Sequence, residues 1–170
     1  MTLHLRPIAD ADTPAILALN LESEAVLSPM DAARYAHLRA QSAYGRVVEE
    51  DGAVVAFLLA FGEGADYDSP NYRWFDARGD AFLYVDRVVV ARSHQGRGLG
   101  AVLYEDLFAF ARAAGVPQVT CEFDVEPPNE ASRRFHARFG FSEVGSQALP
   151  GGKRVSLQRA AVEAGPGRTG

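Results

Sequence analysis

The stretch from residue 86 to residue 115 has residue types and spacing that can bind an anion. It opens with three consecutive valines at 88–90, which are typical of the end of a buried strand, because β-branched side chains suit a pleated surface. Gly96, Gly98 and Gly100 follow, and the apolar residues after them recur at helical spacing. A strand, a glycine-rich turn and a helix in this order direct backbone N–H groups and the positive end of a helix dipole at one spot. That arrangement predicts a phosphate-binding site.

Two classes of ligand compete for this site. Gly96, Gly98 and Ala101 satisfy the dinucleotide fingerprint G-x-G-x-x-G/A. In dinucleotide-binding folds, however, the glycines follow the strand almost at once, whereas residues 91–95 intervene here. The sequence QGRGLG at 95–100 instead resembles the Q/R-x-x-G-x-G/A pyrophosphate loop of the GCN5-related N-acetyltransferase (GNAT) superfamily. In that family the loop holds the diphosphate of acetyl-coenzyme A (acetyl-CoA).

A second motif lies at residues 129–141, NEASRRFHARFGF. Asn129 is a good helix N-cap and Gly140 a good C-terminal stop, so a helix is expected between them. Phe135 and Phe139 are expected to face the core as an i, i+4 pair. The family pattern N-x-x-A/S-x-x-hydrophobic-Tyr-x-x-x-G-F is similar to this stretch. A separate polar stripe is expected along the helix: Asn129, Ser132 and His136.

Together the two motifs cover about residues 81–145, in the order and spacing of the family. The resemblance implies that two neighbouring parallel strands splay apart and that the pantetheine arm of acetyl-CoA lies in the gap. A backbone N–H near the end of the first strand would polarise the thioester carbonyl. The residues expected to contact acetyl-CoA are Val88, Val89, Val90, Gln95, Gly96, Arg97, Gly98, Leu99, Gly100, Asn129 and Ser132.

His136 stands where the family commonly has a tyrosine, whose usual role is to protonate the leaving thiolate. The resemblance therefore implies that His136 is the general acid, although a histidine with a pKa near 6.5 is mostly neutral at pH 7. A neighbouring carboxylate would raise that pKa. The alternative is a histidine that is merely hydrogen-bonded. For the base that deprotonates the acceptor amine the candidates are Asp86 and Glu122, and each can instead have a purely structural role, Asp86 in an ion pair with Arg87.

Residues 62–80 carry little periodicity but many aromatic and acidic side chains, and are expected to form a long loop. One interpretation is a loop folded over the core or into a dimer contact. The other is a wall of the acceptor site that holds a cationic amine. Tyr84 lies on the strand that follows, on the same face as Asp86. The side chains expected to contact the acceptor are Tyr72, Trp74, Phe75 and Tyr84.

The composition is that of an ordinary globular protein, with 170 residues, 48% apolar and 23% charged. A net charge of −5 gives no support to nucleic-acid binding. The single cysteine, Cys121, excludes an internal disulfide and fits a reducing compartment. The sequence has neither a signal-peptide core nor an apolar run of membrane-spanning length, so a cytoplasmic protein that binds no membrane is expected.

The order of the expected elements is typical of an α/β layer fold. A strand at 3–7, helices opened by Thr13-Pro14 and Ser28-Pro29, and a hairpin turning at Asp51-Gly52 precede the strand at 81–90. A strand at 118–125 and two strands about residues 150–152 follow the glycine loop and its helix. The resemblance implies the GNAT fold: a mixed, mostly antiparallel twisted sheet with helices on both faces. One domain over 1–160 and a flexible tail at 161–170 are expected.

The function that the resemblance implies is acetyl transfer from acetyl-CoA to an amine of a small molecule or protein, by direct attack within a ternary complex. No metal is expected, and a homodimer is one assembly that the family uses. Two alternatives stay open. One is an acyl-CoA-binding sensor or partner-binding module without catalysis, in which His136 marks lost chemistry. The other is an oxidoreductase that binds NAD(P).

Overall fold

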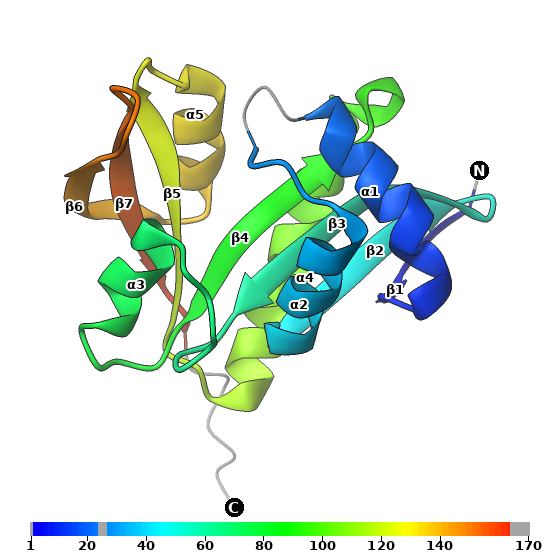
Figure 1. Cartoon of the computed structure of the whole chain (residues 1–170). Coiled ribbons are helices and arrows are strands. Elements are labelled where there is room, and N and C mark those ends of the chain that lie inside the picture. The colour runs from blue at the N-terminus through cyan, green and yellow to red at the C-terminus, as the bar shows by residue number, and fades with distance from the viewer. Residues whose placement is uncertain (1, 24–26, 164–170) are drawn as a thin grey trace, which may run out of the picture. The chain divides into compact units, whose positions relative to one another are not determined.

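The computed structural model describes residues 2–23 and 27–163. Seven strands of this described part form a sheet in the order β1-β2-β3-β4-β5-β7-β6 (Figure 1). The β4–β5 pair is parallel, whereas β1–β2, β2–β3, β5–β7 and β6–β7 are antiparallel. The predicted mixed, mostly antiparallel sheet is therefore confirmed. Packing divides the chain into two compact units, one formed by Met1–Phe61 and Val85–Ala109, the other by Gly62–Tyr84 and Phe110–Gly170.

The first unit begins with the strands β1 (Leu3–Pro7), β2 (Tyr44–Glu50) and β3 (Ala53–Phe61). The predicted hairpin between β2 and β3 is confirmed, since Asp51 and Gly52 both have positive φ, 50° and 86°. Two positive φ angles are what a two-residue turn needs to match the twist of the strands it joins. Strand β3 is buried from residue 55 to residue 61, as its unbroken apolar run predicts.

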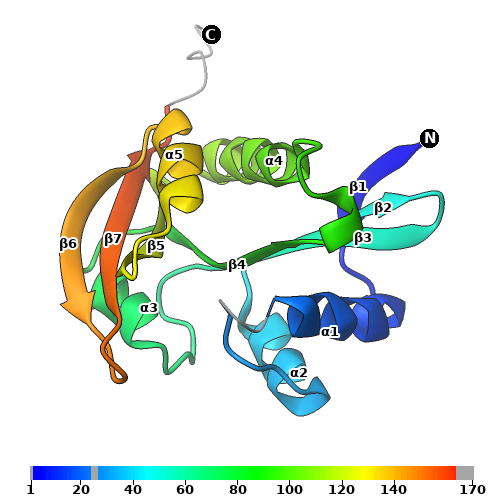
Figure 2. The ribbon, with the colours of Figure 1, turned by 90° about the horizontal axis from the view of Figure 1, so that it is seen from above.

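The two predicted helices of the first unit are α1 (Thr13–Glu22) and α2 (Ala32–Gln41). Helix α2 starts later than the predicted opening at Ser28-Pro29, because Asp31 is its N-cap. The Asp31 Oδ1 accepts a hydrogen bond from the Arg34 N–H at 2.7 Å, which satisfies one of the free donors of the helix end. Figure 2 shows α1 and α2 on the face of this unit's strands opposite α4 (Leu99–Ala114).

The second unit contains β5 (Gln118–Glu126), α5 (Glu130–Arg138), β6 (Ser142–Ala148) and β7 (Arg154–Ala161). The first residues of β4 (Leu83–Val90) pair with β5 through Leu83↔Val119 and Tyr84↔Thr120. Within this unit α5 covers one face of the strands and α3 (Pro70–Asp76) the other, as Figure 2 shows. The strand and helix predictions for residues 118–159 are confirmed.

Helix α3 corrects the prediction that residues 62–80 form a loop throughout. The Oγ of Ser69 accepts a hydrogen bond from the Tyr72 N–H at 3.3 Å, and Pro70 occupies the first turn. A hydroxyl residue followed by proline is the start signal that also predicted α1, at Thr13-Pro14. It was missed here because a helix of seven residues is too short to display a helical period.

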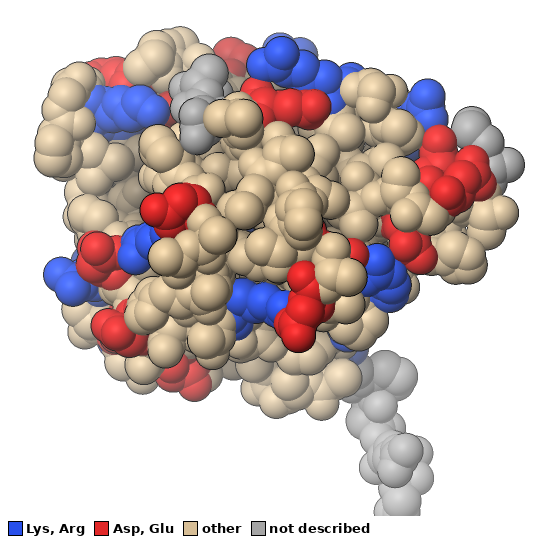
Figure 3. Space-filling view, turned by 45° about the vertical axis from the view of Figure 1, so that its right-hand side comes forward, with Lys and Arg blue, Asp and Glu red and all other residues tan. Residues whose placement is uncertain are grey.

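The end of the chain also differs from its prediction. Ala161 is the last residue of β7, and the Val162 N–H donates to the Pro117 carbonyl at 2.9 Å, so the predicted tail at 161–170 does not begin before residue 163. Residues 164–170 lie outside the described part. None of the described helices is long and apolar enough to cross a membrane. On the face shown in Figure 3, Lys and Arg side chains lie singly or in small groups between Asp and Glu.

Candidate active site

The glycine loop of the first unit has the backbone that anion binding requires. Gly96 and Gly98 have φ of 82° and 78°, a region that side chains with a Cβ rarely adopt, and open space lies where their Cβ atoms would stand. Helix α4 begins at Leu99, and the Val102 N–H donates to the Gly98 carbonyl at 3.1 Å. The first N–H groups of a helix have no carbonyl partner within it, and they lie at the positive end of its dipole.

A carboxylate from the β2–β3 hairpin holds this loop. Glu50 Oε1 lies 3.2 Å from His94 Nε2, and its Oε2 lies 3.6 Å from an Nη of Arg97. His94 belongs to a short 3₁₀ turn (Arg92–His94) that precedes the loop, and the Arg92 guanidinium donates to the Glu22 carbonyl at 2.8 Å. Sequence reasoning missed Glu50, because it is 44 residues away from His94 along the chain. Its only local signal is its place at the end of a strand.

The strand residues before the loop alternate as predicted. Val89 is 2% exposed and belongs to the core, while Val88 and Val90 on the other face are half-buried. The Gln95 side chain donates to the Val90 carbonyl at 3.4 Å, which ties the first residue of the loop to the end of β4. The N–H of Ala91 donates to the Val55 carbonyl at 2.8 Å. The end of β4 is thus hydrogen-bonded both to the glycine loop, through Gln95, and to β3, through Val55.

Asp86 lies in a buried ion pair. Its Oδ2 accepts from Nε of Arg87 at 2.6 Å, and the two side chains are only 4% and 5% exposed. The Arg87 guanidinium also donates to Asn20 Oδ1 at 2.8 Å, and the Asn20 amide donates to the Ser28 carbonyl at 3.2 Å. This network joins β4 to α1 and to the segment before α2. The plain ion pair that the sequence left open is present, and a role for Asp86 as the base stays a prediction.

Helix α5 of the second unit presents His136, and not the phenylalanines, to the core. His136 is 7% exposed and its ring packs against Phe123 and Phe141, at centroid distances of 5.7 and 5.2 Å. Phe135 and Phe139 contact each other as predicted, but both are only half-buried. The expectation that this pair faces the core is wrong, because the spacing tells which residues share a side of the helix and not which side meets the sheet.

Hydrogen bonds within α5 fix the protonation pattern of His136. Its Nδ1 lies 2.7 Å from the Ser132 carbonyl and 3.2 Å from the Ser132 Oγ. A carbonyl only accepts, so Nδ1 carries the proton, and in the neutral ring Nε2 has a lone pair. Burial lowers the pKa of His136, opposed by the bond to Ser132, so the neutral form dominates at pH 7. Asn129 uses its Oδ1 to cap the helix, accepting from the Ser132 N–H at 3.1 Å.

Glu122 lies on the face of β5 opposite the one that contacts His136. The Tyr84 hydroxyl donates to its Oε2 at 2.6 Å, and Tyr84 packs against Tyr72 and Phe75 at centroid distances of 5.7 and 6.0 Å. The odd-numbered neighbour Phe123 contacts His136, so within this unit the predicted base and the predicted acid are on opposite faces of one strand. The structure does bring Tyr84 and Glu122 together, and it separates both from His136.

Most of the aromatic residues predicted to contact the acceptor are in the core. Tyr72, Phe75 and Tyr84 are 1%, 6% and 1% exposed, and the Tyr72 hydroxyl donates to the Gly62 carbonyl at 2.6 Å. This burial favours the interpretation that the segment folds over the core. Contact of these side chains with an acceptor stays a prediction. Cys121 is also a core residue, 2% exposed, and burial raises the pKa of its thiol well above the usual value.

Comparison with known proteins shows the family. The family model of the acetyltransferase (GNAT) family matches residues 12–141, which is most of the chain. The protein therefore belongs to the GNAT family of acetyltransferases, and the resemblance seen in its motifs is confirmed.

Individual relatives add detail. Phosphinothricin N-acetyltransferase of Streptomyces coelicolor is 42% identical over 66 residues, which are 39% of this chain and 37% of that protein. Among solved structures, the ribosomal-protein-S18-alanine N-acetyltransferase of Escherichia coli has a TM-score of 0.73 at 15% identity, with 99% of this chain and 98% of that chain covered. An acetyltransferase structure from Salmonella typhimurium with its cofactor acetyl-CoA has a TM-score of 0.73 at 22% identity, with 99% of each chain covered. At these identities the two structures establish the fold alone.

Proposed function

We propose that the protein is an acetyl-CoA-dependent N-acetyltransferase that acts on an amine of a small molecule or protein. The observation that carries this proposal is the glycine loop before α4, with two positive φ angles, open space at both Cβ positions and the free N–H groups of a helix start. Family membership and the acetyl-CoA held by a structure of the same fold support it. They also disfavour the NAD(P)-dependent alternative, because the fold is not the dinucleotide-binding one.

The residues present fit the cofactor that the family implies. The N–H groups at residues 96–101 would hold the diphosphate, because a Cβ at Gly96 or Gly98 would occupy the space that it needs. Acetyl-CoA, when bound, supplies the acetyl group as a thioester. Glu50 already partners both His94 and Arg97, so the loop keeps its shape by ion pairing and binds through its backbone.

His136 would handle the proton at Nε2. In its neutral form this nitrogen accepts a proton that the amine releases on attack, and the Ser132 carbonyl stabilises the imidazolium through Nδ1. The imidazolium then gives the proton to the leaving sulfur, which is the role that the family's tyrosine fills. One proton thus moves from nitrogen to sulfur without a net change at His136. This sequence explains how a histidine whose pKa is lowered can still end as the acid.

Glu122 is the better of the two carboxylates for taking the first proton, which the ammonium form of the acceptor must lose before its attack. The Tyr84 hydroxyl donates to the Glu122 side chain, whereas Asp86 is paired with a buried guanidinium that would lose its counter-charge. Removing one member of a buried ion pair costs about 3–5 kcal/mol of stability. A change at Asp86 therefore alters the fold as well as the chemistry, and Glu122→Gln is the cleaner test of the base.

We further propose that the protein works in the cytoplasm as a homodimer. A single cysteine kept as a buried thiol fits a reducing compartment. The dimer rests on the resemblance to the family, and sedimentation of the full chain measures it.

Gly98→Val tests the proposal. We expect at least about tenfold weaker binding of acetyl-CoA, because the valine side chain would occupy the place of the diphosphate. Gly64→Val is a matched control, since Gly64 has a φ of 77° and equally open space but lies in the second unit. Both variants carry the same backbone strain. Titration calorimetry with acetyl-CoA and with NAD(P) should show binding of the first ligand only. Equal affinities of the two variants for acetyl-CoA would remove the loop from the binding site.

A further inference from the structure

A pocket of about 230 Å³ lies within the second unit, away from both proton-handling groups. Its lining comes from α3, the segment between α3 and β4, the start of β5, and strands β6 and β7: Trp74, Phe75, Arg78, Asp80, Phe82, Gln118, Val144 and Arg159. Gln118 precedes Glu122 by four residues on β5, a distance of about 13 Å along a strand. His136 is on the opposite face of that strand, as its contact with Phe123 shows. The pocket is therefore separate from the groups assigned to proton transfer.

The floor of the pocket is apolar and aromatic. Phe75 and Phe82 are 6% and 1% exposed and contact each other at a centroid distance of 6.2 Å, and Phe75 meets Trp74 edge-on at 5.0 Å. An enclosed apolar volume of about 150 Å³ accommodates a benzene ring. The pocket therefore has room for one aromatic ring and a small polar group attached to it.

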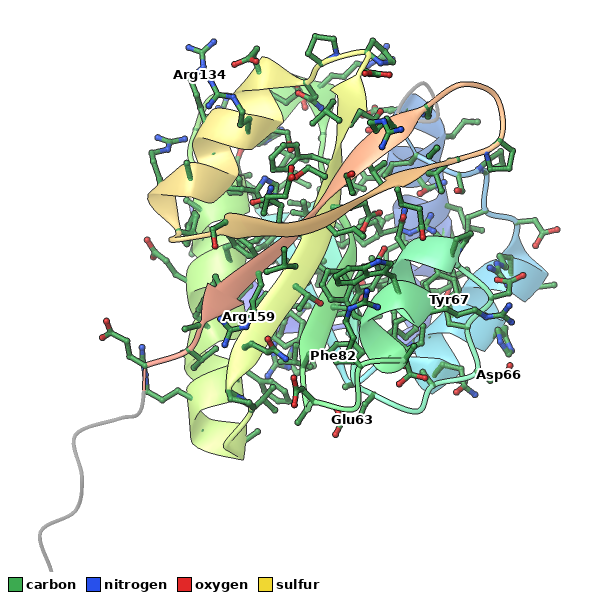
Figure 4. All side chains as sticks on the ribbon, turned by 90° about the vertical axis from the view of Figure 1, so that its left-hand side faces the viewer. Glu63, Asp66, Tyr67, Phe82, Arg134 and Arg159 are labelled. Atoms are coloured by element: carbon green, nitrogen blue, oxygen red, sulfur yellow. The ribbon has the colours of Figure 1, made fainter. Side chains whose placement is uncertain are left out.

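The charged side chains at the pocket are mainly cationic, and both arginines are hydrogen-bonded within the unit. The Arg159 Nε donates to Gln118 Oε1, while Gln118 Nε2 donates to the Ala81 carbonyl at 3.2 Å. Because an arginine has five N–H donors, this bond leaves the terminal nitrogens of Arg159 to face a ligand. Figure 4 shows Arg159 on β7 and Phe82 just before the start of β4, on either side of β5.

The second guanidinium is anchored in the same manner. Arg78 lies over the ring of Trp74 and donates to the Trp74 carbonyl. With Asp80, the lining carries two positive charges and one negative charge. This balance is wrong for the cationic amine that the aromatic residues of this segment suggested. It suits a carboxylate, which a fixed guanidinium binds through two parallel hydrogen bonds.

We propose that this pocket is a second ligand site that takes a small aromatic carboxylate. The ring lies on Trp74, Phe75 and Phe82, and the carboxylate faces Arg78 and Arg159. The site uses neither the glycine loop nor His136, so it stands or falls separately from the proposed function.

Trp74 makes the proposal directly testable, because it is the only tryptophan in the chain and it lines the pocket. Benzoate is the probe, and its binding is followed by the tryptophan fluorescence of the full chain without acetyl-CoA. Benzamide has the same shape without the charge, and benzylamine has the opposite charge. We expect saturable binding of benzoate, at least about fivefold tighter than that of either neutral or cationic analogue.

Arg159→Gln and Arg78→Gln should each weaken benzoate binding by about fivefold or more. Arg154→Gln is the matched control, since Arg154 is also exposed on β7 but donates to the Ser146 Oγ at 3.3 Å, outside the pocket. Circular dichroism checks that all three variants fold. Three results would each overturn the proposal. The first is the absence of a saturable fluorescence change with benzoate, and the second is binding of benzamide or benzylamine as tight as that of benzoate. The third is a loss of benzoate affinity in Arg154→Gln equal to the loss in the two pocket variants.

Discussion

His136 shows how one hydrogen bond sets the chemistry of a side chain. A histidine in place of a tyrosine looks at first like a poorer proton donor, because its lower pKa leaves the ring mostly deprotonated at pH 7. The Ser132 carbonyl, 2.7 Å from Nδ1, fixes the tautomer of the ring and so decides which nitrogen can exchange a proton. It leaves Nε2 as a proton acceptor in the neutral ring and as a donor only after protonation. The residue is thus suited to passing a proton on, which a tyrosine that keeps its own proton does less readily.

His136→Phe should lower kcat by about 10²–10⁴-fold, the usual range for loss of an acid–base group. Burial lowers the pKa of His136 below 6.5, so the rate of the native enzyme should fall as the pH drops through that lowered pKa. The phenylalanine variant should lack this limb of the pH–rate profile, with little change in the KM for acetyl-CoA. His136→Tyr should recover part of the rate, because tyrosine can still donate.

The same measurement tells catalysis from packing. A phenylalanine variant with native kcat and an unchanged acidic limb would assign His136 to the core of the unit alone. It would also bring back the acyl-CoA sensor that the sequence left open. A tyrosine variant that is inactive while the phenylalanine variant works would mean that the space beside Phe123 and Phe141 has no room for a hydroxyl.

Strand β6 and helix α3 meet through a glycine and the tryptophan. A Cβ at Gly145 would overlap the indole of Trp74, so no other residue fits at this point of β6 without moving the ring. Asn71 of the same helix accepts a hydrogen bond from the Gln147 amide at 3.0 Å, two residues further along the strand. The position of α3, and with it the wall of the aromatic pocket, therefore depends on a residue that carries no side chain.

Gly145→Ala should destabilise the protein by about 1–3 kcal/mol, the usual cost of an added group in a packed contact. Chemical denaturation followed by circular dichroism measures the free energy of unfolding. The double variant Trp74→Ala with Gly145→Ala is the control. Once the indole is gone, the alanine at residue 145 should cost nothing further, so the two changes should not be additive. An additive result would place the cost elsewhere in β6.

Most of the chain's local order follows from local signals in the sequence. Asp51-Gly52, the caps Asn129 and Gly140 and the glycine loop act over a few residues, where backbone preference decides the outcome. Tertiary packing decides the rest. The hold of Glu50 on the loop and the bond from Arg87 to Asn20 join residues 44 and 67 positions apart, and no local pattern reports them. Tertiary packing also decides which side of α5 meets the sheet.

The candidate site divides in the same way. The phosphate loop could be predicted because it depends on glycine and on a helix start. The roles of the titratable residues could not, because Asp86 and Glu122 look alike in sequence. They differ in their partners, which include a buried guanidinium for Asp86 and the Tyr84 hydroxyl for Glu122.

The buried thiol of Cys121 should make the folded protein unreactive toward thiol reagents. Only a thiolate attacks a disulfide reagent, and this thiol is 2% exposed with a raised pKa. The native chain should therefore not react with Ellman's reagent. All thiol that the reagent detects during turnover should then be released coenzyme A. In denaturant the chain should react once, at its single cysteine. Any slow labelling under native conditions would then measure the rate at which the whole unit opens. Rapid labelling of the folded protein would contradict the burial of Cys121.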